Sequence, residues 1–155
     1  MSTGLVIAII GAAFAAILTG IGSSIGVQMG GRAAAGVLSE KPELFGKLLI
    51  LQALPGTQGI YGFLFAILMM VQLGLLGGNI PDLTAGEGWA YFGASMPIAI
   101  IGFASAILQA KTSVAAIHMT AKQPGSSARG MTMAAMVETY AILALLASIL
   151  IIFNL

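Results

Sequence analysis

Cysteine and charge are what this chain of 155 residues has least of. It contains no cysteine, which excludes disulfide bonds and thiolate-bound metal sites. Only 7% of its residues are charged, against about 25% in an ordinary soluble domain. The net charge is +1 and the basic residues form no cluster, so no nucleic-acid partner is expected. A hydrophobic content of 59% and a mean hydropathy of +1.05 instead predict an integral membrane protein.

Four long apolar segments make up most of the chain, and each exceeds the roughly 20 residues that a membrane-spanning helix needs. They cover residues 3–36, 45–78, 88–120 and 129–154. Period-2 alternation is absent from them, which favours helices over the strands of a membrane barrel. The apolar N-terminus lacks a basic region, so we expect a retained span rather than a cleaved signal peptide. The predicted fold is all-α, with four transmembrane helices.

The charged connections indicate how these helices are oriented. All six basic residues lie near the first and third connections: Arg32, Lys41, Lys47, Lys111, Lys122 and Arg129. By the positive-inside rule, the turns near residues 37–46 and 121–129 are expected to be cytoplasmic. Both termini and the middle connection, residues 77–82, then lie on the outer side of the cell membrane. Trp89 and Tyr91 are expected at that outer interface as aromatic anchors.

The two halves of the chain look like a repeat of one helical hairpin. Two stretches align: Ser24–Gln28 with Ser105–Gln109, and Lys41-Pro42 with Gln123-Pro124. Because both turns are basic, the two copies have the same orientation, which makes the repeat parallel rather than inverted. We therefore divide the chain into a first hairpin, residues 1–80, and a second hairpin, residues 81–155.

Small residues indicate which helices pack closely. In the first segment they recur at every fourth position in two rows: Gly4, Ala8, Ala12, Ala16, Gly20 and Ser24, and then Gly22, Gly26 and Gly30. Such rows let helix backbones approach one another closely in a membrane. The first and third helices are therefore expected to be tightly packed, with the second and fourth outside them. This pattern suits a crowded inner layer such as a ring, with a generic helical bundle as the alternative.

A single carboxylate, Glu138, lies within the apolar fourth segment. At 1.5 Å per residue it would lie roughly 12 Å from the beginning of the segment and about 25 Å from its end. A charge so deep in the hydrocarbon layer is costly, and such residues usually serve transport. Glu138 is therefore the first candidate for function, as a group that takes up and releases a proton or a metal cation. The alternative is a protonated carboxyl that only joins neighbouring helices.

Polar residues in the second and third segments offer partners for this carboxylate. Pro55 interrupts the second helix, and three polar side chains follow it at spacings that let them share a face: Thr57, Gln58 and Tyr61. Gln109 adds a second amide from the third segment. Hydroxyl, amide and carboxylate oxygens are hard donors, and one monovalent cation with one carboxylate makes a neutral site. The extra oxygens favour Na⁺ over a proton, although each polar group could instead only hold helices together.

Other classes of protein share some of these features. The sequence has no phosphate-binding loop and no nucleophile–base pair, so neither catalysis nor an organic cofactor is expected. A small proton-coupled exporter also has four spans and one membrane glutamate, but it should line a substrate cavity with aromatic residues. A purely structural proteolipid would make Glu138 dispensable.

Three motifs stand out along the chain: Leu54-Pro55-Gly56-Thr57-Gln58-Gly59-Ile60-Tyr61-Gly62, Phe92–Ala99 and Ala134–Leu143. Together with the duplicated hairpins, they resemble the proteolipid of the membrane rotor (the c or K subunit) of V-type ATPases over essentially the full length. The resemblance is greatest to the bacterial sodium-translocating branch. It implies a homo-oligomeric ring in the lipid membrane that turns against a stator subunit with a membrane arginine. Central-stalk subunits would connect that ring to a separate soluble head that hydrolyses ATP.

The resemblance also implies roles for individual residues. Glu138 is the carboxylate that carries the ion. Three residues match the side-chain ligands for sodium: Thr57, Gln58 and Gln109. The backbone carbonyl of Leu54 matches the main-chain ligand, and Tyr61 matches the residue that hydrogen-bonds and locks the glutamate. Proton-carrying relatives generally lack the full polar set, so Na⁺ is the expected ion and H⁺ the alternative.

Overall fold

The computed structural model describes residues 1–78 and 80–155, in which it contains helices and turns but no strand. Asn79, in the predicted middle connection, lies outside the described residues. The α-helices are α1 (Thr3–Leu38), α2 (Phe45–Ala53), α3 (Thr57–Gln72), α4 (Ala85–Lys122) and α5 (Ser127–Ile152). Short 3₁₀ turns lie between them: η1 (Pro42–Leu44), η2 (Leu54–Gly56), η3 (Leu75–Gly77) and η4 (Pro124–Ser126). The all-α prediction is confirmed.

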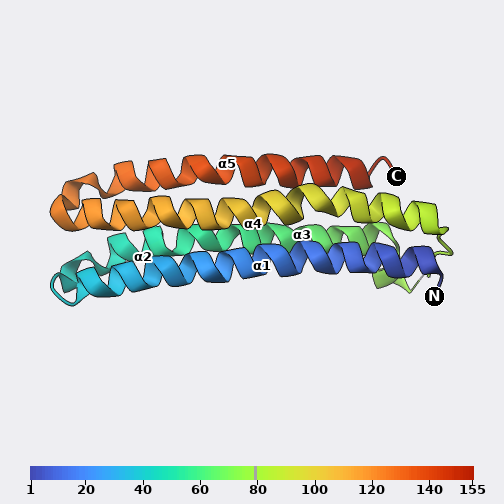
Figure 1. The fold of residues 1–155 in the computed structure, drawn as a ribbon, viewed down its shortest axis with the longest axis horizontal. Coiled ribbons are helices and arrows are strands. Elements are labelled where there is room, and N and C mark those ends of the chain that lie inside the picture. The colour runs from blue at the N-terminus through green and yellow to red at the C-terminus, as the bar shows by residue number, and fades with distance from the viewer. Residues whose placement is uncertain (79) are drawn as a thin grey trace.

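Four rods run side by side along the molecule, and α2 and α3 together form one of them (Figure 1). Within the described residues, four helical stretches are long and apolar enough to cross a membrane: Thr3–Leu38, Pro42–Gln72, Ala85–Lys122 and Pro124–Ile152. The α1–α2 turn and the α4–α5 turn lie at one end of the bundle, and both termini lie at the other (Figure 1). The two hairpins therefore run in the same direction, as predicted for a parallel repeat.

The second span ends earlier than the predicted Gly78. Helix α3 stops at Gln72, and Gly74 then has a φ of 73°, in the left-handed region that commonly ends a helix. Gly78, with a φ of 78°, follows η3 in the same conformation. Gly74 thus turns the chain out of the helix before the predicted boundary, and Gly78 ends the following 3₁₀ turn at that boundary.

The third span begins earlier than the predicted Gly88. Helix α4 starts at Ala85 because Thr84 forms a capping box with Glu87. The backbone N–H of Glu87 donates to Thr84 Oγ1 at 3.3 Å, and the N–H of Thr84 donates to the Glu87 carboxylate at 2.8 Å. This cap fixes the beginning of the helix within the polar connection.

Helices α1 and α4 make the most extensive contact in the bundle. Their backbones approach so closely that a Cβ atom added at Gly22 would lie 2.8 Å from the Phe103 carbonyl oxygen. A Cβ atom at Gly11 would lie 2.8 Å from the Cα atom of Phe92. Only glycine permits these approaches, so the prediction that the first and third spans are the tightly packed pair is confirmed.

The predicted rows of small residues hold only in part. Ala8 and Ala12 are buried as expected, but Gly20 has no neighbour within 4 Å of an added Cβ and Ser24 is exposed. A row with a step of four residues drifts by about 40° per step around a helix of 3.6 residues per turn, so it leaves the interface. The second row then continues the contact: Gly22, Gly26 and Gly30 are all buried.

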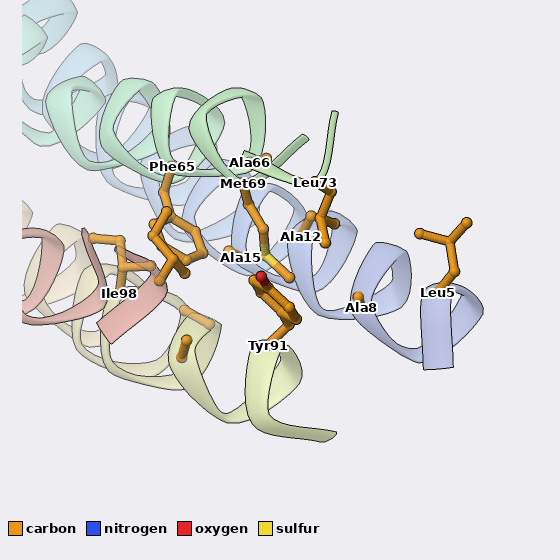
Figure 2. Close-up of a cluster of buried hydrophobic side chains, with 13 residues drawn as sticks. Leu5, Ala8, Ala12, Ala15, Phe65, Ala66, Met69, Leu73, Tyr91 and Ile98 are labelled. Carbon is orange, nitrogen blue, oxygen red and sulfur yellow. The ribbon is translucent and has the colours of Figure 1, made fainter. Parts of the chain in front are cut away.

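A hydrophobic core fills the space between α1, α3 and α4 toward the end that holds the termini, and it includes Leu5, Phe65, Met69 and Ile98 (Figure 2). Tyr91 belongs to this core and points toward Met69 (Figure 2). The prediction that Tyr91 is an interfacial anchor is therefore wrong, whereas Trp89 is 59% exposed. Residues two apart lie on nearly opposite helix faces, so the two rings cannot both face outward.

Candidate functional site

The site begins at an interruption of the second span. Pro55 has no N–H, so the α-helical hydrogen bond to the Leu51 carbonyl cannot form, and the chain passes through η2. There the backbone N–H of Thr57 donates to the Leu54 carbonyl oxygen, and Thr57 Oγ1 donates to the same oxygen at 2.9 Å. Gly26 of α1 leaves room for the proline, because an added Cβ would lie 2.7 Å from Pro55 Cβ. The interruption thus brings the Leu54 carbonyl beside the Thr57 hydroxyl.

Two glutamine side chains meet between α3 and α4. Gln58 and Gln109 are both completely buried, with 0% exposure. Gln58 Nε2 donates to Gln109 Oε1 at 2.6 Å and to Ser105 Oγ at 3.3 Å. The other end of the Gln58 amide, Oε1, lies 3.4 Å from Thr57 Oγ1. Because an unpaired amide is costly inside a bundle, these bonds hold both side chains in defined orientations.

Glu138 of α5 completes the site. Its Oε1 accepts a hydrogen bond from the Tyr61 hydroxyl at 2.5 Å, and its Oε2 accepts one from Gln109 Nε2 at 3.3 Å. Gln109 Nε2 also donates to the Ala134 carbonyl oxygen at 3.1 Å. Glu138 and Tyr61 are partly exposed, whereas the two glutamines are buried. The carboxyl therefore lies at the edge of the site, where another molecule can reach it.

A continuous series of hydrogen bonds and close polar contacts joins all six residues that the sequence predicts for the site: Leu54, Thr57, Gln58, Gln109, Glu138 and Tyr61. They come from η2, α3, α4 and α5, so both hairpins contribute. The described part of the chain has no group of three or more His, Cys, Asp or Glu residues that could hold a metal ion. The donors gathered here are neutral oxygens and one carboxylate, a set that suits a proton or a hard monovalent cation.

Two serines that bond to Gln58 or to the residue beside it were not among the predicted site residues. Ser105 is 4% exposed; besides accepting from Gln58, it donates to the Val137 carbonyl oxygen at 3.2 Å. Ser23 of α1 accepts a hydrogen bond from the backbone N–H of Gly59 at 2.7 Å. Serines are common in membrane helices, so neither stands out by residue type alone.

The repeat register is the signal that could have found these serines. Ser23 and Ser105 are separated by the same interval as Pro42 and Pro124. The predicted alignment of Ser24 with Ser105 is one residue out of this register. Ser24 is exposed, and its hydroxyl donates to the Ile21 carbonyl of its own helix at 2.9 Å.

Comparison with known proteins finds the two halves of the chain in the register that pairs Ser23 with Ser105. The family model for the C subunit of ATP synthase matches the chain twice, at residues 10–69 and 92–151, an offset of 82 positions. The V-type sodium ATPase subunit K of Enterococcus hirae is 46% identical over 151 residues, which are 97% of this chain and 93% of that protein. The A-type ATP synthase subunit K of Methanocaldococcus jannaschii is 34% identical over 148 residues, 96% of this chain and 62% of that protein. This chain therefore belongs to the family of the ATP synthase C subunit, the non-catalytic proteolipids that form the membrane rotor of rotary ATPases.

Proposed function

We propose that this rotor proteolipid carries Na⁺ across the membrane in a V-type ATPase, with Glu138 as the carrying carboxylate. The observation that supports it is the continuous hydrogen-bonded chain of oxygen donors around that carboxylate, far from either end of α5. Membership of the rotor family sets aside the exporter and the structural proteolipid. The similarity to a protein named as a sodium ATPase subunit favours Na⁺ over H⁺.

The proposed ligands are the Glu138 carboxylate, the Thr57 hydroxyl, the amide oxygens of Gln58 and Gln109, and the Leu54 carbonyl oxygen. Each carbonyl oxygen has two lone pairs, so Gln109 Oε1 can accept from Gln58 and still bind a cation. One carboxylate and one monovalent cation form a neutral site, which crosses hydrocarbon at much lower cost than a charge. The hydroxyl of Tyr61 holds the carboxylate in this closed arrangement.

Transport follows from the cost of a charge in lipid. Copies of the chain form a ring, and occupied sites turn past the lipid because they are neutral, whereas an empty, charged site cannot. At a stator subunit, a membrane arginine stabilises the empty carboxylate while one ion leaves and the next arrives. The partial exposure of Glu138 and Tyr61 gives such a stator access to the site. Central-stalk subunits turn the ring as a soluble head hydrolyses ATP.

The orientation in the cell membrane is part of the proposal. The turns near residues 37–46 and 121–129 lie at one end of the bundle (Figure 1), and that end carries most of the basic side chains. By the positive-inside rule this end is cytoplasmic and both termini are outside. Both hairpins contribute to the proposed site in this orientation. The first, residues 1–80, supplies the neutral ligands of α3, and the second, residues 81–155, supplies the carboxylate.

The test is the rate at which a hydrophobic carbodiimide modifies Glu138 in the detergent-solubilised ring. This reagent reacts with a protonated carboxyl, so a cation that occupies the site should slow it. At fixed pH and ionic strength, we expect the rate to fall as Na⁺ replaces choline. A rate that responds to pH but not to Na⁺ would mean that the site carries protons, and Thr57, Gln58 and Gln109 would then serve only to hold the helices together.

A further inference from the structure

Ser105 holds the buried amide of Gln58 in one orientation. A glutamine NH₂ group has two hydrogens, and here one goes to Gln109 Oε1 at 2.6 Å and the other to Ser105 Oγ at 3.3 Å. The serine hydrogen is used in turn, because Ser105 Oγ donates to the Val137 carbonyl at 3.2 Å. Its oxygen is therefore an acceptor toward Gln58. With both N–H groups engaged on the α4 side, the Gln58 carbonyl oxygen is left on the side of Thr57.

The repeat-equivalent serine holds the backbone beside the same glutamine. Ser23 Oγ accepts from the N–H of Gly59, the residue next to Gln58, at 2.7 Å. A Cβ atom on Gly59 would lie 3.1 Å from Ser23 Cβ, so a residue without a side chain suits this approach. Gln58 is thus fixed from both α1 and α4, by two serines that occupy the same position in the two halves of the chain.

We propose that Ser105 is a positioning residue that sets the preference of the site for Na⁺ over H⁺, because it keeps the carbonyl oxygen of Gln58 turned toward the cation. The inference rests on the proposed function. Without the serine acceptor, one N–H of Gln58 would be buried with no partner. The amide would then be held on the α4 side by one hydrogen bond, to Gln109, instead of two, and it could turn away from the orientation that points its carbonyl oxygen to the cation. A turned amide removes one oxygen ligand and presents N–H groups to the cation, whereas a proton on Glu138 needs only the carboxyl.

The chain offers matched variants for a test. Ser105→Ala removes the acceptor, and Ser105→Cys nearly preserves the volume while supplying only a weak acceptor. Ser105→Thr retains the hydroxyl, and its extra methyl group can enter the open groove of about 170 Å³ that Ser105 lines between α4 and α5. The control is Ser113→Ala on the same helix: Ser113 is also completely buried, but its hydroxyl has no hydrogen-bond partner in the described residues.

The measurement is carbodiimide labelling of Glu138 in assembled rings, as a function of Na⁺ at fixed pH and as a function of pH without Na⁺. For Ser105→Ala and Ser105→Cys, we expect the Na⁺ concentration that halves the labelling rate to rise about tenfold, the effect of losing roughly one hydrogen bond. Ser105→Thr and Ser113→Ala should stay close to the natural chain. The pH dependence without Na⁺ should be the same in all variants.

Each result decides between the proposals. If Na⁺ slows labelling equally in the natural chain, Ser105→Ala and Ser105→Cys, the role of Ser105 is wrong and Na⁺ transport stands. A pH profile that shifts as much as the Na⁺ dependence also overturns it, because Ser105 would then act on Glu138 itself. If Na⁺ does not slow labelling of the natural chain, both proposals fail. If Ser105→Ala rings do not assemble, Ser105→Cys and Ser105→Thr are compared instead. The proposal then requires that Na⁺ slows labelling less effectively in Ser105→Cys than in Ser105→Thr.

Discussion

The two hairpins share one pattern, yet only the second contains a membrane carboxylate. At the repeat offset of 82 positions, Gly56 occupies the place of Glu138 and Val27 the place of Gln109. The first hairpin nevertheless contributes Thr57, Gln58 and Tyr61 to the network around Glu138. The duplicated halves have therefore become unequal parts of one site rather than two sites.

This inequality has a consequence for the energetics of the proposed rotor. Four membrane helices share one carboxylate, so under the proposed function each copy of the chain would move one ion per turn of the ring. A ring with a given number of helices then moves fewer ions per turn than one with a carboxylate in every hairpin. Fewer ions per ATP allow each ion to be driven against a larger gradient, which suits a pump better than a synthase.

Removing the one membrane carboxylate should have the largest effect, because it abolishes the main difference between the two hairpins. Glu138→Gln keeps the size of the side chain but removes the charge that the proposed cation requires, so Na⁺ transport by the reconstituted ATPase should be lost. The ring should still assemble, because a neutral amide is tolerated in the bundle. Uptake of radioactive Na⁺ into vesicles measures transport, and gel filtration measures assembly. The control is Glu40→Gln in the exposed first turn, which should transport normally; transport by Glu138→Gln would contradict the assignment.

The two hairpins also differ in how closely their helices approach. Ala144 stands in the second hairpin where the first has Gly62. A Cβ atom on Gly62 would collide with Thr19 Oγ1 and lie 2.7 Å from the Ala15 carbonyl oxygen. Gly62→Ala should therefore destabilise the protein by about 1–3 kcal/mol. The measurement is the temperature at which the detergent-solubilised ring dissociates.

The control for that variant is Gly36→Ala, because Gly36 is also helical but has nothing within 4 Å of an added Cβ. Alanine is favoured over glycine in a helix by about 1 kcal/mol, so this variant should be as stable as the natural ring or slightly more so. If Gly62→Ala dissociates at the same temperature as Gly36→Ala, the α1–α3 approach is looser than the structure indicates.

The hydroxyl that bonds to Glu138 is present in one hairpin only. It belongs to Tyr61 of the first hairpin, and the equivalent residue of the second hairpin is Leu143. Tyr61→Phe removes the hydrogen bond to Glu138 Oε1 but keeps the aromatic ring of the side chain. The loss of about 0.5–1.5 kcal/mol should raise the Na⁺ concentration that halves carbodiimide labelling roughly two- to tenfold. Transport should persist. Tyr140→Phe is the control, since Tyr140 is 65% exposed on α5; an equal effect of both variants would argue against a locking role for Tyr61.

The sequence predicted the spans, and which residues lie together around Glu138, better than it predicted details of packing. Length and hydropathy define a membrane helix almost by themselves, and a carboxylate in an apolar run is rare enough to stand out. The polar residues after Pro55 could be grouped with it because their spacing puts them on one helix face. The position of the Leu54 carbonyl could not be derived in this way, because Pro55 breaks the hydrogen bond to Leu51 and not one to Leu54.

Other features depend on contacts that no local pattern contains. Tyr91 is buried because α1 and α3 enclose the inner face of α4, and an aromatic residue near a helix end looks the same whether it faces lipid or protein. Ser105 resembles any other serine of a membrane helix until its partner on α3 is known. The early end of α3 depends on Gly74, which the sequence surrounds with leucines on both sides.

The last prediction tests the register of the two halves. Ser23→Ala removes the acceptor for the Gly59 N–H between α1 and α3, which should lower stability by about 1 kcal/mol. Ser24→Ala removes only an exposed hydroxyl that bonds to its own helix, so ring dissociation should occur at the natural temperature. Both substitutions remove the same hydroxyl group from neighbouring positions of one helix, so each variant is the control for the other. A larger effect of Ser24→Ala would favour the alignment of Ser24 with Ser105, and the pairing of Ser23 and Ser105 around Gln58 would then be wrong.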